Sequence, residues 1–230
     1  MSADPKSLRR AIIFAGGDLV KGGGERRLLG GPWEYVILAD SGAKHALDLG
    51  MEPTVLLGDM DSIDPGVRSR LAKAPTLTFP EDKDKTDSQL AVEWALARGA
   101  NYILIAGGIG SRLDHSLANA HLLYLIHRAG ATGVVTDGRQ SVYLLLDHLA
   151  LEAPPGHSLS ILPLTTTCRS LVLQGLRWEV SGADLVIGDT RFVSNEFTHK
   201  PASLSLASGM ALVIVGSEVD RPSPSTTQSH

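Results

Sequence analysis

Short, uninterrupted apolar runs alternate with amphipathic stretches over the first 140 residues, and this alternation constrains the fold more than any other feature. The candidate strands are residues 11–15, 35–39, 54–57, 76–79, 102–106 and 134–136. Strands without polar interruption are typical of sheets covered on both faces. Helical patterns lie between these runs, at residues 43–49, 65–73, 87–98 and 114–129. The pattern therefore predicts a Rossmann-like α/β domain, with a mostly parallel sheet and helices on both of its sides.

Cap and turn residues support the predicted helix boundaries. Thr86 followed by Gln89 is the pattern of a capping box that would open the third helix. Gly99 and Gly130 stand where the third and fourth helices should end. In the fourth helix, a set of apolar side chains shares one face, as in an amphipathic helix: Leu113, Leu117, Ala120 and Tyr124.

The pattern of apolar and polar residues changes after residue 140. Residues 141–215 carry short β-like runs separated by turn signals, at residues 142–146, 158–162, 170–173, 185–187, 203–206 and 211–215. Closely spaced strands of this kind predict a small antiparallel β-sandwich. We therefore expect an α/β domain at residues 1–140 and a β-sandwich at 141–218. The Ser-, Thr- and Pro-rich residues 219–230 are expected to form a disordered tail.

Composition and charge exclude several classes of protein. The net charge of −4 lacks the basic field that non-specific nucleic-acid binding needs. The single cysteine, Cys168, cannot form an intrachain disulfide, which is typical of a reducing compartment. The run at residues 11–15 is shorter than the ~7–15 residues of a secretory core, and none reaches the ~18 apolar residues of a membrane helix. We expect a cytoplasmic protein that binds neither nucleic acid nor membrane.

Two acidic motifs follow predicted strands. In Gly58-Asp59-Met60-Asp61-Ser62, the two aspartates are two residues apart and can face one small volume. Such a carboxylate pair suits a hard divalent cation such as Mg²⁺. In the second motif, residues 81–87, Lys83 and Lys85 would add positive charge beside a helix N-terminus, which favours phosphate. The alternatives are an acidic turn that caps the next helix and a solvated charged loop.

A third motif, residues 107–115, reads Gly-Gly-Ile-Gly-Ser-Arg-Leu-Asp-His and follows the predicted strand at 102–106. Its glycines allow the backbone to approach a ligand closely. Arg112 can bind phosphate in a bidentate manner, and Asp114 and His115 begin a helix. The alternative is a glycine-rich turn with a capping aspartate, and a structural hydrogen bond explains His115 as well as catalysis does.

These three motifs, and Asp40 in Ala-Asp-Ser-Gly-Ala, all stand at the carboxyl ends of predicted strands, where open α/β sheets bind ligands. If the strands are neighbours, their aspartates form a negatively charged cup that is costly without a metal ion: Asp40, Asp59, Asp61, Asp82, Asp87 and Asp114. The P-loop, the dinucleotide-binding glycine pattern after the first strand and the Gly-x-Ser-x-Gly elbow are absent from the sequence.

In their order and spacing the four motifs, with Asn119 a turn after His115, resemble the catalytic domain of thiamine pyrophosphokinases. Gly175-Leu176-Arg177-Trp178 and Ser194-Asn195-Glu196-Phe197 resemble the two stretches of the family's β domain that help form the thiamine pocket. The resemblance covers residues 11–216. Lys44 and Ser111 depart from the family, which often has Asn and Gly at these positions.

The resemblance implies an N-terminal domain for ATP and Mg²⁺, and a homodimer with thiamine sites between its subunits. By residue match, Mg²⁺ would be held by Asp59, Asp61, Asp82 and Asp114. The nucleotide phosphates would be surrounded by Asp40, Lys83, Thr86, Asp87, Arg112 and His115. Thiamine would contact Trp178, Ser194 and Asn195, with the indole face toward the cationic ring.

The implied reaction transfers the β,γ-pyrophosphate of ATP to the thiamine hydroxyl and releases AMP. Its catalytic residues would be Asp59, Asp61, Asp87, Arg112 and Asp114, with Asp87 or Asp114 accepting the hydroxyl proton. Other functions stay open at this point. They are a pyrophosphokinase of the same superfamily acting on a pterin alcohol, a non-catalytic nucleotide or thiamine sensor, and a structural protein whose aspartates cap helices.

Overall fold

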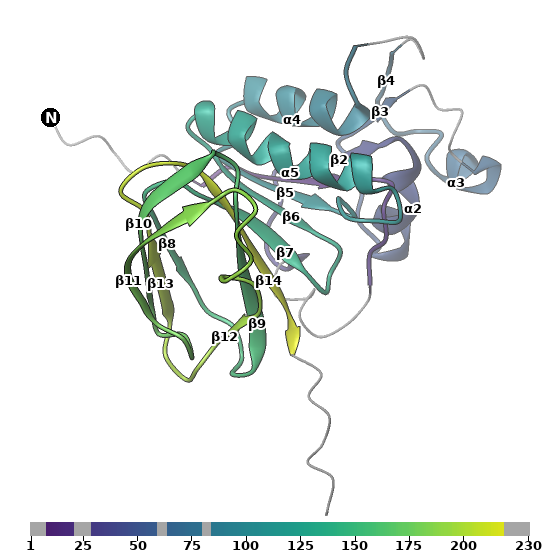
Figure 1. The fold of residues 1–230 in the computed structure, drawn as a ribbon. Helices are drawn as coiled ribbons and strands as arrows, with labels where there is room; N and C mark the ends of the chain where they lie inside the picture. Colours follow the sequence, from purple (N-terminus) through teal and green to yellow (C-terminus); the bar gives the residue numbers. More distant parts are fainter. Residues whose placement is uncertain (1–7, 21–28, 59–63, 80–83, 219–230) are drawn as a thin grey trace, which may run out of the picture. The chain divides into compact units, whose positions relative to one another are not determined.

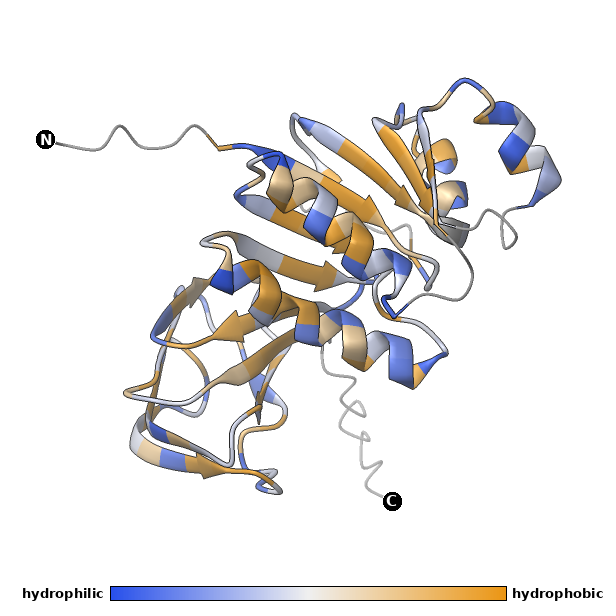
Figure 2. Cartoon of the chain, turned by 90° about the horizontal axis from the view of Figure 1, so that it is seen from above, coloured by the Kyte–Doolittle hydropathy of each residue, from blue (hydrophilic) through white to orange (hydrophobic). Residues whose placement is uncertain are grey.

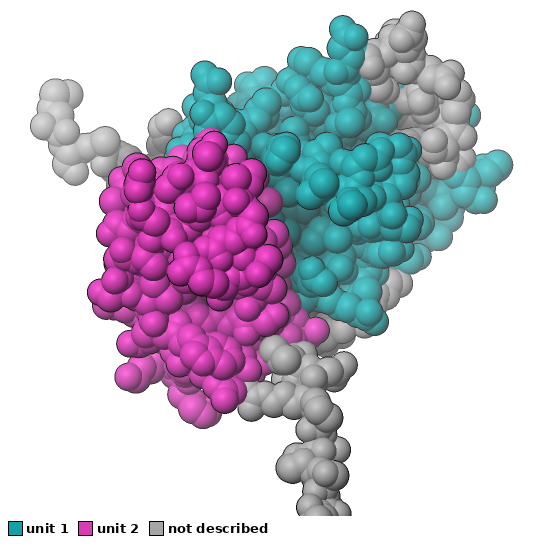
Figure 3. Space-filling view, viewed as in Figure 1, with its two compact units in different colours: residues 1–144 teal, residues 145–230 magenta. Residues whose placement is uncertain are grey.

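The computed structural model describes residues 8–20, 29–58, 64–79 and 84–218, and the elements are labelled in Figure 1. The chain divides into two compact units, residues 1–144 and residues 145–230, which Figure 3 shows in different colours. Among the described residues, no helix has the length and apolar character needed to cross a membrane.

The first unit is built on a mostly parallel sheet. Its strands are β1 (Arg10–Phe14), β2 (Tyr35–Ala39), β3 (Val55–Gly58), β4 (Thr76–Thr78), β5 (Tyr102–Ala106), β6 (Thr132–Thr136) and β7 (Ser141–Leu145). They lie in the order β4-β3-β2-β1-β5-β6-β7, with β1 to β6 paired in parallel and β7 antiparallel to β6. The chain proceeds outward from β1 to β4 and then returns to the other side of β1. The strand order therefore reverses between β1 and β5.

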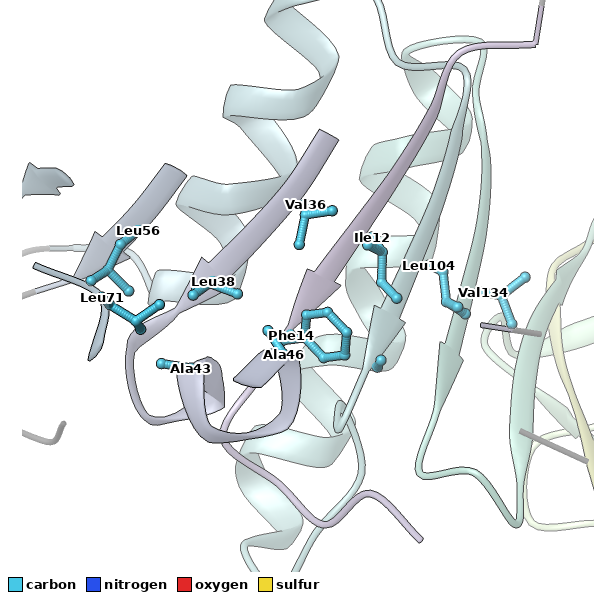
Figure 4. Packing of buried hydrophobic residues seen from close by; sticks show 11 residues of the cluster. Ile12, Phe14, Val36, Leu38, Ala43, Ala46, Leu56, Leu71, Leu104 and Val134 are labelled. Carbon is cyan, nitrogen blue, oxygen red and sulfur yellow. The ribbon is translucent and has the colours of Figure 1, made fainter. Parts of the chain in front are cut away.

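Both faces of the central strands are covered, as the uninterrupted apolar runs predict. Ile12 and Phe14 point to one face, where they pack with Leu38 and with Ala43 and Ala46 of α2 (Ala43–Asp48), as Figure 4 shows. The alternate residues of β1 are also fully buried, on the opposite face. Figure 2 shows the resulting hydrophobic strands of this sheet. Edge strand β4 is the exception, because all of its residues are exposed.

The described residues also form the α-helices α3 (Pro65–Arg70), α4 (Asp87–Ala97) and α5 (Leu113–Arg128). Thr86 caps α4, since its Oγ1 accepts the Gln89 N–H at 3.2 Å. The predicted capping box forms only on this side, because the Gln89 amide donates to Glu93 at 3.0 Å instead. Gly99 and Gly130 follow α4 and α5 with φ angles of 83° and 77°, which confirms them as helix stops.

The apolar face expected on the fourth helix is wrong for most of its members. Leu113, Leu117 and Tyr124 of α5 are 69%, 50% and 40% exposed. The buried face instead consists of Asn119, Ala120, Leu122, Leu123 and Ile126. This set follows the i, i+3, i+4, i+7 spacing and brings its bulky side chains to β6, which α5 contacts. The position of β6 therefore determines which face of α5 is buried.

The second unit contains only antiparallel strand pairs among its described residues. Its strands are β8 (His148–Leu151), β9 (His157–Pro163), β10 (Thr167–Gln174), β11 (Val180–Val186), β12 (Asn195–Glu196), β13 (Ala202–Ser205) and β14 (Ala211–Glu218). Within this unit they form the orders β12-β9-β14 and β11-β10-β13-β8. The expected antiparallel strands are present. Strands β8 and β12 were not predicted, and β12, with two residues, is too short to give a pattern.

Candidate functional site

A cleft of about 330 Å³ opens at the carboxyl ends of the parallel strands in the first unit. It lies where the strand order reverses, since its walls are the loops that follow β1 and β5. Ala39 at the end of β2 and Ser41, together with the N-terminus of α4 and the start of α5, complete the lining. Open α/β sheets bind ligands at such a reversal. The topology therefore marks this cleft as the candidate site.

The two walls are joined backbone to backbone. The Gly17 N–H donates to the Gly107 carbonyl at 2.9 Å, and the Asp18 N–H donates to the Ile109 carbonyl at 3.1 Å. A Cβ on Gly17 would lie 2.5 Å from the oxygens of both Gly107 and Ile109. Gly107 itself has a φ of 69°, which side chains rarely adopt. Glycine is therefore required at both positions for the loops to approach each other.

Two buried polar side chains support these loops from below. On α2, the Nε2 atom of His45 lies 2.8 Å from the Gly17 carbonyl oxygen. On α5, the Nδ2 atom of Asn119 donates to the Gly108 carbonyl at 2.8 Å. Burial lowers the pKa of His45 below its ordinary value, and the hydrogen bond to Gly17 only partly opposes this effect. Because a carbonyl can only accept, the neutral His45 ring carries its proton on Nε2 and donates it.

The cleft gathers groups that bind anions. Thr86, Asp87 and Ser88 place the N-terminus of α4 in its lining, and α5 begins there with Arg112 as its N-cap. The first N–H groups of a helix have no partner within the helix and carry a partial positive charge. Together with the guanidinium of Arg112, they form a site suited to phosphate groups.

Arg112 and Asp114 form an exposed ion pair at the start of α5. The Nη2 of Arg112 lies 2.7 Å from one carboxylate oxygen of Asp114, and Nε lies 3.3 Å from the other. The Arg112 guanidinium holds the pKa of the Asp114 carboxyl below its usual value. Exposed pairs contribute little to stability, so Arg112 can exchange this carboxylate for another anion at small cost.

A second cluster of candidate residues surrounds Trp178 in the second unit. The indole is 52% exposed, whereas Asn195 is only 6% exposed. The Oδ1 of Asn195 accepts the Trp178 N–H at 3.1 Å, and its Nδ2 donates to the Trp178 carbonyl at 2.7 Å. Oδ1 also accepts the N–H of Glu196 at 2.8 Å. Asn195 therefore fixes the backbone that presents the exposed indole.

Neighbouring residues complete this cluster. The guanidinium carbon of Arg177 lies 4.7 Å from the centre of the Trp178 ring, and its Nη1 lies 3.0 Å from a carboxylate oxygen of Glu196. Ser194 adopts a φ of 64°, and its N–H donates to Ser160 Oγ at 3.0 Å. A strained backbone of this kind at a non-glycine residue often marks a functional site.

Comparison with known proteins gives the family. Residues 31–134 match the family model described as "Thiamin pyrophosphokinase, catalytic domain", and residues 148–211 match "Thiamin pyrophosphokinase, vitamin B1 binding domain". The thiamine pyrophosphokinase of Bacillus subtilis (strain 168) is 32% identical over 187 residues, which are 76% of this chain and 84% of that protein.

The chain belongs to the thiamine pyrophosphokinase family.

Solved thiamine pyrophosphokinases share the fold. The crystal structure of the Bacillus subtilis enzyme has a TM-score of 0.82 and 26% identity, covering 92% of this chain and all (100%) of that one. The enzyme from Candida albicans has a TM-score of 0.75 at 14% identity, covering 91% of this chain and 89% of that one, and it shows the fold alone. The predicted family and enzyme class, a thiamine pyrophosphokinase and hence a transferase, are therefore confirmed. The comparisons do not support a pterin pyrophosphokinase or a sensor.

The structure of this thiamine pyrophosphokinase brings some of the predicted site residues together. Thr86, Asp87, Arg112 and His115 line the cleft. Asp114 is paired with Arg112 beside them. Trp178, Ser194 and Asn195 gather in the second unit through the bonds described above and the adjacent β12.

Other predicted positions lie outside the described part of the chain: Asp59, Asp61, Asp82 and Lys83. Asp40 belongs to the short 3-10 helix η1 (Asp40–Gly42) that follows β2, and its side chain is not described. Within residues 8–20, 29–58, 64–79 and 84–218, no three His, Cys, Asp or Glu side chains come together in a way that could hold a metal ion.

Sequence reasoning missed several residues of this cleft. Gly16, Gly17, Ser41 and Ser116 line it, and His45 supports it. The Gly16-Gly17 pair directly after the first strand was an available signal, because the first loop of such a sheet commonly approaches a phosphate. His45 gave no signal, since its partner is a backbone carbonyl on another element.

Proposed function

We propose that this thiamine pyrophosphokinase transfers the β,γ-pyrophosphate of ATP to the hydroxyl of thiamine, yielding thiamine pyrophosphate and AMP. The observation that carries the ATP assignment is the cleft between the loops that follow β1 and β5, with two helix N-termini and Arg112 in its lining. Backbone N–H groups and a guanidinium are suited to a triphosphate. In this proposal residues 1–140 form a Rossmann-like catalytic domain, and residues 141–218 form a β-sandwich that binds thiamine.

Magnesium is the cation that the donor chemistry fits. Asp59 and Asp61 follow directly on β3, and Asp114 lies at the start of α5 after β5. Because β3 and β5 belong to one parallel arrangement, their carboxyl ends face the same edge of the sheet. We propose that these three residues and Asp82 hold Mg²⁺, since carboxylate oxygens are its preferred protein ligands. The bound ion would neutralise negative charge on the phosphate oxygens.

The residues of the cleft then have separate roles in the transfer. The thiamine hydroxyl oxygen forms a bond to the β-phosphorus, while the bond from this phosphorus to the oxygen that bridges it to the α-phosphorus breaks, and AMP leaves. Arg112 releases Asp114 and binds phosphate oxygens, where it stabilises the charge that develops. Thr86 and His115 position the phosphates together with Asp40 and Lys83.

Asp87 is the better candidate for accepting the hydroxyl proton. Asp87 lines the cleft at the N-terminus of α4. Asp114 is one of the four carboxylates assigned to Mg²⁺, and a carboxylate bound to the ion is not available to accept the proton. We therefore assign the proton to Asp87, and we assign Asp114 to charge balance and metal binding.

The thiamine site is assigned to the second unit. The family model for vitamin B1 binding spans residues 148–211, which include Trp178, Ser194 and Asn195. The exposed face of Trp178 would pack against the thiamine ring system, and Ser194 would contact it through its hydroxyl. Asn195 acts through the Trp178 backbone that it holds. The resemblance to the family also supports a cytoplasmic homodimer.

Turnover with defined substrates tests this function. The purified chain is incubated with Mg-ATP and thiamine, and AMP and thiamine pyrophosphate are separated by chromatography. We expect equal amounts of both products, and no AMP when thiamine is omitted or replaced by a pterin alcohol. AMP release that does not depend on thiamine would exclude the proposal.

A paired substitution tests the metal assignment. Asp61→Asn should lower turnover by ~100-fold or more, because one catalytic charge is often worth that factor. Asp64→Asn is the matched control. Asp64 caps α3, accepting the Gly66 N–H at 2.8 Å, and asparagine caps equally well. Equal activity of the two variants would exclude Asp61 from the site.

A further inference from the structure

His45 is a buried, titratable side chain beside the cleft, and the proposed transfer gives it no role. It lies on α2 and is 7% exposed. Its Nε2 atom is 2.8 Å from the carbonyl oxygen of Gly17, which lines the cleft. Its Cδ2 atom lies 3.3 Å from where a Cβ on Gly107 would be. One imidazole therefore underlies both loops that form the walls.

We propose that His45 is a positioning residue of the active-site cleft, whose Nε2–H holds the Gly17 carbonyl and thereby fixes the Gly16–Gly17 turn against the loop after β5. The inference rests on the proposed function only in that ATP occupies this cleft. The hydrogen bond itself and its effect on the turn can be tested without any substrate.

The geometry of one peptide group explains why this bond matters. The Gly17 carbonyl and the Asp18 N–H belong to the same planar trans peptide, so they point in opposite directions. His45 binds the carbonyl side, and the Ile109 carbonyl accepts the Asp18 N–H at 3.1 Å on the other side. The peptide plane is thus fixed from both ends. Two adjacent glycines would otherwise give this turn wide conformational freedom.

The charge state of His45 agrees with this role. The charged groups that act on it are Lys44 and Asp48 of the same helix and Asp18 of the supported turn. Burial outweighs them and keeps the imidazole neutral, with its proton on Nε2. A neutral donor can hold the loop without placing a buried positive charge beneath the cleft.

Two substitutions at this position separate the hydrogen bond from the volume of the side chain. His45→Leu fills the space but cannot donate a hydrogen bond. His45→Gln carries an amide N–H close to the position of Nε2 and does not titrate. Hydrogen exchange of the Asp18 amide reports the closure of the turn directly, because this amide is bonded to Ile109. Calorimetry with Mg²⁺ and a non-hydrolysable ATP analogue reports the cleft.

We expect His45→Leu to accelerate Asp18 exchange and to weaken binding of the analogue by about 10-fold or more, with a matching rise in the KM for ATP. His45→Gln should stay within about threefold of the unmodified protein in both measurements. Unchanged exchange and binding in His45→Leu would overturn the proposal. Equal impairment of both variants would also do so, as would a lower melting temperature without any effect on Asp18.

Failure of the proposed function would look different. In that case the unmodified protein would give no thiamine-dependent AMP, whereas the exchange of the Asp18 amide would still distinguish His45→Leu from His45→Gln.

Discussion

Removing the side-chain amide of Asn195 should destabilise the second unit by a predictable amount. The side chain makes three hydrogen bonds, two to the backbone of Trp178 and one to the N–H of Glu196. Asn195→Ala leaves these backbone groups without this partner, at a side chain that is itself only 6% exposed. Each bond contributes about 1 kcal/mol net, so we expect a loss of about 3 kcal/mol in the free energy of unfolding.

The change can be measured by urea and thermal unfolding. For a chain of this size, about 3 kcal/mol corresponds to a melting temperature lower by about 6–12 °C. Because Trp178 would lose its fixed backbone, we also expect a higher KM for thiamine, with kcat changed less. Because the chain also contains Trp33 and Trp94, the indole fluorescence of Trp178 is a local probe once these two are replaced by phenylalanine.

Asn195→Asp is the matched variant. It keeps the acceptor for the Trp178 and Glu196 N–H groups, but it replaces the donor to the Trp178 carbonyl, 2.7 Å away, by a second oxygen. The aspartate variant should therefore keep two of the three hydrogen bonds, and its free energy of unfolding should lie between those of the unmodified protein and Asn195→Ala. A loss below about 0.5 kcal/mol in Asn195→Ala, together with a raised KM for thiamine, would refute the positioning role and favour direct contact with thiamine.

Three further outcomes follow from the cleft. Gly17→Ala should abolish ATP binding, measured by calorimetry, and lower the free energy of unfolding by about 2 kcal/mol or more, because its Cβ would meet backbone oxygens. The control is Gly50→Ala, where a Cβ has open space at a φ of 66°. It should lower the free energy of unfolding by about 1 kcal/mol and leave ATP binding intact. Arg112→Gln should raise the pKa of the Asp114 carboxyl toward its usual value in an NMR titration. Because the pKa of His45 is lowered in the folded state, the unfolded chain takes up this proton at a higher pH than the folded protein does. The contribution of neutral His45 to stability is therefore full above about pH 6.5 and is lost as the pH falls through the folded pKa. Urea unfolding between about pH 5 and 8 should show a smaller dependence in His45→Gln.

The parallel strands were predictable because burial on both faces leaves a continuous apolar run in the sequence. Residues 35–39 and 102–106 match the observed β2 and β5 without error. The face of α5 was not predictable in this way. Leu117 and Leu122 are equally apolar, and only the position of β6 decides that Leu122 is buried. Strand β12 has two residues, too few for any periodicity.

The composition of the cleft lining was predictable where the type of a single residue is the signal, since Asp87 and Arg112 were predicted at the site and do line the cleft. It was not predictable where residues act on a backbone that becomes a neighbour only after folding. His45 and Gly17 belong to different elements, and their contact depends on α2 lying beneath the loop after β1. Asn195 is predicted at the substrate, and its hydrogen bonds to the backbone of Trp178 could not be foreseen from the sequence. The type of a residue shows what it can bond, whereas the fold selects its partner.

The reversal of strand order beside β1 also affects the timing of assembly during synthesis. Strand β1 leaves the ribosome first, yet one of its two neighbours, β5, pairs residue Ile103 with Ala11 and emerges much later. Until then β1 has an open edge, and the loop after it lacks the Gly107 carbonyl to which it binds. Nascent chains that end before β5 should therefore remain dependent on chaperones, and the ability to bind nucleotide should emerge abruptly with the second half of this unit.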